Sequence, residues 1–62
     1  MRKITKRETN LKAGTIIYHK DCFLEILEYD ETHGLYICMT DEDEVYSCTP
    51  ADLIGDTIER EV

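Results

Sequence analysis

The sequence predicts a small, mainly β domain, and three observations lead to this class. The stretch 22–48 consists of apolar runs separated by polar turns, the pattern of two β-hairpins placed end to end. The single proline, Pro50, lies outside these runs, as expected when strand N–H groups are hydrogen-bonded. The length of 62 residues allows one domain with a single small core.

Runs rich in β-branched and aromatic residues predict four strands, at 15–19, 22–29, 35–40 and 45–48. A turn at 11–14 leads into the first strand, because Gly14 readily takes backbone angles that other residues avoid. The turn at 30–34 holds Gly34 where a positive φ is expected, which indicates a hairpin with a bulge or a longer loop. An acidic turn at 41–44 joins the last two of these strands.

Regular pairing in both hairpins places apolar side chains on both faces of the sheet. If Tyr29 lies opposite Leu35 and Ile37 opposite Cys48, one face carries Phe23, Leu27, Tyr29, Leu35, Ile37 and Met39. The other face carries Leu24, Ile26, Tyr36, Cys38, Cys22 and Val45. In a flat sheet, one of these apolar faces would be exposed to water, which is unfavourable. The sequence therefore favours a sheet curled into a small barrel. The alternative is a homodimer that covers the second face.

The C-terminal segment carries a helix-start signal at Thr49. A hydroxyl at the cap, Pro50 in the first helical position and Asp52 three residues after the cap favour one helical turn, which Gly55 can end. A last short strand over 56–62 then turns Ile58 inward. The alternative is a helix over 50–62 packed on a three- or four-stranded sheet, because the apolar residues there also fall at helical spacing.

This order of elements resembles the SH3-like barrels, in particular those of the KOW or Tudor type. The resemblance rests on the entry Gly14-Thr-Ile-Ile17, the second strand and its continuation over 23–31, and the turn Pro50-Ala-Asp-Leu53. It covers most of the chain as a pattern of elements, without a specific motif. It implies a five-stranded barrel over 11–62 that binds peptides, other proteins or RNA and has no enzymatic activity.

Charge is distributed unevenly along the chain, which has a formal net charge of −7. The first twelve residues hold five bases and one acid, and the rest holds two bases and thirteen acids. The sequence therefore predicts a basic, flexible arm over 1–10 on an acidic body that repels phosphate backbones. An alternative function follows from the arm: an accessory module that contacts nucleic acid through Arg2, Lys3, Lys6 and Arg7.

The acidic residues predict a surface that binds a basic protein. Asp41, Glu42, Asp43 and Glu44, together with Asp30, Glu31, Glu25 and Glu28, would form a negative ridge that imitates a phosphate backbone. Small phage-encoded and bacterial inhibitors work in this way, and the chain resembles them in size and sign of charge. Tyr18 and Tyr36 are predicted as exposed aromatic anchors beside the charges. The function predicted is that of a regulator or inhibitor; the competing interpretation of 41–44 is a solvated turn.

No cofactor or catalytic group is predicted. His19, Cys22, Cys38 and Cys48 are zinc-type ligands, but the predicted register points Cys38 and Cys48 to opposite faces, so no metal site is expected. Burial in apolar strand runs would leave the thiols unactivated. Three cysteines without Cys-x-x-Cys spacing, no apolar run of membrane-spanning length and no signal peptide predict a cytoplasmic protein with reduced thiols.

Overall fold

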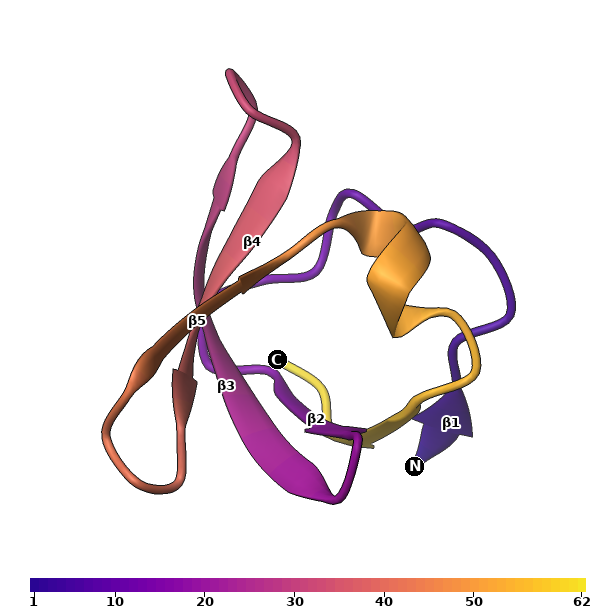
Figure 1. The fold of residues 1–62 in the computed structure, drawn as a ribbon. Helices are drawn as coiled ribbons and strands as arrows, with labels where there is room; N and C mark the ends of the chain where they lie inside the picture. Colours follow the sequence, from indigo (N-terminus) through magenta and orange to yellow (C-terminus); the bar gives the residue numbers. More distant parts are fainter.

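The computed structural model describes residues 1–62 and contains one antiparallel sheet of six strands (Figure 1). The order in the sheet is β1-β6-β2-β3-β4-β5, and a short 3₁₀ helix, η1, lies between β5 and β6. The elements are β1 (Arg2–Lys3), β2 (Ile16–His19), β3 (Cys22–Asp30), β4 (Leu35–Thr40), β5 (Val45–Cys48), η1 (Pro50–Leu53) and β6 (Thr57–Arg60). The helix of four residues is far too short to cross a membrane.

The mainly β class and the order of elements are confirmed. β4 and β5 have the predicted bounds, and β2, β3 and β6 differ from prediction by a few residues at their ends. The predicted helix-start signal is a complete capping box, in which the Thr49 side chain accepts from the Asp52 N–H and the Asp52 side chain accepts from the Thr49 N–H. The alternative C-terminal helix is wrong, since Thr57–Arg60 is a strand with Ile58 buried.

The sheet differs from the predicted five-stranded barrel in its number of strands and in its edges. A sixth strand, β1, pairs with β6, and no pairing joins β1 to β5, so the sheet is open. Figure 1 shows the sheet strongly bent, with η1 carrying the chain from β5 back toward β6. The bend gives the sheet one inner face, which holds the core.

The N-terminal segment is packed on the sheet, whereas the sequence predicts a flexible arm there. Ile4 is 1% exposed and belongs to the core. Its N–H donates to the Asp56 carbonyl at 2.8 Å, and its carbonyl accepts from the Gly55 N–H at 2.7 Å. The charges around Ile4 concealed this role, because one aliphatic residue among bases does not form a strand pattern.

The pairing of β3, β4 and β5 corrects the predicted register. A β-bulge between Ile26 and Glu28 sets Glu28 opposite Ile37 and Tyr29 opposite Tyr36, and Cys48 lies opposite Tyr36 rather than Ile37. A shift by one residue moves side chains to the other face. Cys38 and Cys48 therefore share the inner face, contrary to prediction, and Tyr36 is fully buried. The buried apolar residues are Ile4, Leu11, Ile17, Leu24, Ile26, Tyr36, Cys38, Cys48, Leu53 and Ile58.

Candidate functional site

The side chains that point away from the core on β2–β5 form a surface, here called the outer face, that is both apolar and acidic. The cross-strand residue pairs on this face include Tyr18 with Phe23, Glu25 with Met39, Glu28 with Ile37, and Met39 with Val45. Several apolar members are well exposed, with 44% for Phe23 and 65% for Val45. The outer face consists of Ile16, Tyr18, Phe23, Glu25, Glu28, Asp30, Leu35, Ile37, Met39, Val45 and Ser47.

The bulge in β3 brings the acids of this strand to one side. Residues three apart in a regular strand point to opposite faces. The extra residue at Leu27 lets Glu25 and Glu28 both lie outward, opposite Met39 and Ile37. The same shift keeps Ile26 and Tyr29 on the inner side, where the Tyr29 and Tyr36 rings lie 4.7 Å apart. An acidic column on β3 therefore lies beside an apolar column of Leu35, Ile37 and Met39 on β4.

The acidic turn after β4 is rigidly built around Thr40. Its Oγ1 accepts from the N–H groups of Glu42 at 3.2 Å and Glu44 at 3.1 Å, and its N–H donates to the Glu44 carbonyl. Asp43 has a φ of 61°, a conformation that aspartate tolerates better than most residues. All four acids are exposed, so a turn with a hydrogen-bonded backbone presents their charges to solvent.

A shallow groove of about 270 Å³ connects the acidic turn with the apolar part of the outer face. Asp41 and Asp43 line it from the turn, and Phe23, Met39 and Ile16 line it from the strands; the other lining residues are Leu24, Glu25 and Thr40. Glu42 and Glu44 do not line it. The sequence pattern predicts that Phe23 and Met39 share a face but does not mark either as a binding residue. The turn and the strands thus form one continuous mixed surface.

The second acidic turn lies at the other end of β3 and β4. Asp30 Oδ1 accepts from the Thr32 N–H at 3.0 Å, and Asp30 Oδ2 lies 2.8 Å from His33 Nδ1. This contact with His33 holds the pKa of Asp30 below its ordinary value. Six residues of β4 separate the two turns, about 20 Å of strand. Asp30 and Glu31 are therefore not part of the groove.

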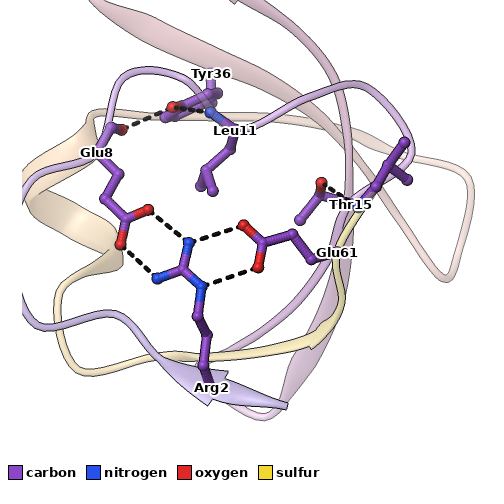
Figure 2. A network of polar contacts seen from close by, with 7 residues as sticks. Arg2, Glu8, Leu11, Thr15, Tyr36 and Glu61 are labelled. Atoms are coloured by element: carbon purple, nitrogen blue, oxygen red, sulfur yellow. Dashed lines mark hydrogen bonds and ion pairs between the residues drawn. The ribbon is translucent and has the colours of Figure 1, made fainter.

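The two tyrosines predicted as anchors have different environments. Tyr18 is 39% exposed, and its ring lies 5.0 Å from that of Phe23 on the outer face. Tyr36 is buried, which contradicts the prediction, and its hydroxyl donates to the Glu8 carbonyl at 2.7 Å and accepts from the Leu11 N–H at 3.1 Å. Figure 2 shows this hydroxyl between the two backbone groups. Tyr36 thus fixes the N-terminal segment and is not available to a partner.

The guanidinium of Arg2, the first of the predicted phosphate-binding residues, is already hydrogen-bonded to two carboxylates of the chain. It donates to both carboxylate oxygens of Glu8, at 2.7 and 2.8 Å, and to both of Glu61, at 2.8 and 2.9 Å (Figure 2). Its charge is thereby offset. Lys3, Lys6 and Arg7 are exposed, so three cations of the segment remain available.

The hydrogen bonds of Arg2 with Glu8 and Glu61 predict that the folded protein becomes less stable in acid. The hydrogen bond from Arg2 lowers the pKa of Glu8 below its ordinary value of 4.5. A lowered folded-state pKa stabilises the protein above the unfolded-state value, and this stabilisation is lost as the pH falls through the folded-state value. In urea denaturation from pH 7 to pH 3, Glu8→Gln should therefore lose less stability than wild type. Glu31→Gln, which removes an exposed acid without such a contact, should follow the wild-type curve; a shift equal to that of Glu8→Gln would contradict the assignment.

His19 is the one buried ionisable residue on the inner side of β2. Its Nδ1 lies 2.5 Å from Asp56 Oδ2, which links β2 to the loop before β6. Its Nε2 is buried without a hydrogen-bond partner. The cysteines are all reduced thiols: Cys38 and Cys48 are buried, and Cys22 is half-buried. The hydrogen bond with Cys48, together with burial, raises the pKa of Cys38, so this core thiol stays protonated.

No group of three or more His, Cys, Asp or Glu residues is arranged to hold a metal ion. Comparison with known proteins found no matching family model, no matching curated protein and no matching solved structure.

Proposed function

We propose that the protein is a non-enzymatic, SH3-like binding module whose outer face docks on a basic surface of another protein and thereby regulates or inhibits it. The observation that carries this proposal is the groove in which Asp41 and Asp43 adjoin the exposed side chain of Phe23 and the half-buried side chain of Met39. Acids alone are consistent with a solvated turn. Acids beside exposed apolar side chains provide both attraction at long range and surface to bury on contact.

The two parts of the surface have separate roles in the proposed complex. The acids of the turn, with Glu25 and Glu28, steer a basic partner and align it by opposite charge. Phe23, Met39 and Tyr18 provide the apolar centre on which most of the affinity of an interface depends. The acidic column along β3 also supports the proposal of charge mimicry, in which the face occupies a groove that otherwise holds a phosphate backbone.

The alternative proposal, binding of nucleic acid through the basic segment, rests on Lys3, Lys6 and Arg7. Their exposure favours it. It is the weaker candidate, because Arg2 is held by two carboxylates and three cations give only a small, salt-sensitive affinity. Replacing the three with glutamine leaves the proposed protein interface intact and abolishes any oligonucleotide binding that depends on them.

Two charge-matched variants test the proposal on the partner recovered by affinity capture with the purified chain. Asp41→Asn/Asp43→Asn removes two charges that line the groove, and Glu42→Gln/Glu44→Gln removes two from the same turn outside it. Both variants should associate more slowly than wild type at low salt, because both weaken steering. Only the groove variant should also dissociate faster, by roughly tenfold, since it loses short-range contacts.

Surface plasmon resonance at several salt concentrations separates these effects. Added salt should slow the association of wild type steeply and leave its dissociation rate almost unchanged. Equal dissociation rates for the two variants would remove the groove from the interface. A wild-type association rate in both variants at low salt would show that the acids of the turn do not steer the partner.

A further inference from the structure

The imidazole of His19 has one nitrogen satisfied and one free. The carboxylate of Asp56 only accepts hydrogen bonds, so Nδ1 carries the hydrogen and donates it to Asp56 Oδ2. In the tautomer with its hydrogen on Nδ1, the ring offers the lone pair of Nε2 as a ligand, and this atom is buried and has no partner. A buried polar atom without a partner is rare in folded proteins and costs free energy. The carboxylate–imidazole arrangement is also the one that orients histidine ligands in metal sites.

Cys22 supplies a second donor on the strand next to His19. It is the cross-strand partner of His19, so the two side chains lie on the same face at the end of the β2–β3 hairpin. Both line a pocket of about 190 Å³, together with Lys20, Leu24, Thr40 and Tyr46. The Cys22 thiol has only long contacts, 3.6 Å to the Phe23 carbonyl and 3.8 Å to Asp41 Oδ1. At these distances neither contact is a strong hydrogen bond, so the thiol has no firm partner within the chain.

We propose that His19 Nε2 and the Cys22 thiolate form a binding site for a soft monovalent metal ion, Cu(I). Thiolate and imidazole are ligands that Cu(I) prefers, and a closed-shell monovalent ion accepts coordination by two donors. Zinc sites use three or four protein ligands, and the chain offers no such group here. On binding, Cys22 releases its proton to solvent, the oxidation state of the metal does not change, and Asp56 keeps its hydrogen bond to Nδ1.

Titration of the full chain under anaerobic, reducing conditions tests the site. Cu(I), competed against a chromophoric chelator, and Ag(I), as a redox-inert probe, should each bind once per chain by native mass spectrometry. Cys22→Ser should abolish binding, and Asp56→Asn should weaken it by roughly 10- to 100-fold through the loss of ring orientation. His33→Gln, which changes an exposed histidine paired with Asp30, should bind as wild type does.

Spectroscopy on the wild-type protein locates the ion without relying on variants. X-ray absorption should show one sulfur and one nitrogen around the metal, and the ¹⁵N resonance of His19 Nε2 should shift more than that of Nδ1. Two sulfur ligands, with undiminished binding in Cys22→Ser, would assign the ion to Cys38 and Cys48 and overturn the proposal. An absence of one-to-one binding would overturn it as well.

Discussion

Ile4→Ala is expected to lower the free energy of unfolding by about 2–4 kcal/mol, as for other fully buried aliphatic residues. The side chain is buried in the core, and the backbone of Ile4 is hydrogen-bonded to Asp56 and Gly55. Such a loss is a large fraction of the stability of a domain of this size. Urea denaturation followed by circular dichroism measures it directly.

Thr5→Ala is the matched control, because Thr5 is the exposed neighbour of Ile4 in the same segment. It should change stability by less than about 0.5 kcal/mol, as surface substitutions usually do. If Ile4→Ala behaved like Thr5→Ala, residues 1–10 would be the flexible arm that the charge pattern predicts, and β1 would not be part of the folded sheet.

Tyr36→Phe is expected to cost about 1–3 kcal/mol although it removes a single oxygen. The Tyr36 hydroxyl is the hydrogen-bond partner of both the Leu11 N–H and the Glu8 carbonyl, and its loss leaves buried backbone groups unsatisfied. Burial raises the pKa of Tyr36, so the hydroxyl stays protonated and able to donate. Faster amide hydrogen exchange at Leu11 should accompany the loss of stability.

Tyr29→Phe provides the comparison for Tyr36→Phe. The Tyr29 ring lies against that of Tyr36 but is only half-buried. Its replacement should therefore leave the stability and the exchange rate at Leu11 almost unchanged. Equal costs for the two variants would show that ring packing, and not the link from β4 to the N-terminal segment, accounts for the effect of Tyr36→Phe.

The features that could be predicted from the sequence are those with a local cause. Strand bounds follow from apolar runs and turn residues, as in β4 and β5. The turn at η1 follows from the capping residues Thr49, Pro50 and Asp52, and the positive φ of Gly14 and Gly34 follows from their positions in turns. In each case, neighbours within a few residues decide the conformation.

The features that could not be predicted depend on contacts across the sheet. No residue around Leu27 marks a bulge in the sequence, because the bulge depends on packing across the sheet. It keeps Ile26 and Tyr29 on the inner face while Glu28 points outward. The pairing of Tyr36 with Cys48 depends on how the acidic turn closes at Thr40. With two faces of similar apolarity, the pattern alone does not decide which is buried, so the predicted exposure of Tyr36 is wrong.

The candidate site also combines features that the sequence predicts with features that depend on contacts across the sheet. The acids of the turn after β4 are exposed, as a hydrophilic turn predicts. Their connection to Phe23 and Met39 depends on the pairing of β3 with β4, and the separation of Asp30 and Glu31 depends on the length of β4. A ridge that joins all the acids could be drawn from the sequence, but only the structure divides it into a groove, a column and a distant turn.

Mapping the interface by NMR tests the proposed function most directly. The ¹⁵N-labelled chain would be titrated with its captured partner, and transfer of saturation from the partner would identify the contacting amides. The proposed docking surface predicts the strongest effects at Phe23, Glu25, Met39, Asp41 and Asp43, with little change at Lys3, Lys6 and Arg7. Effects confined to these three basic residues, or to the distant turn at Asp30 and Glu31, would contradict it.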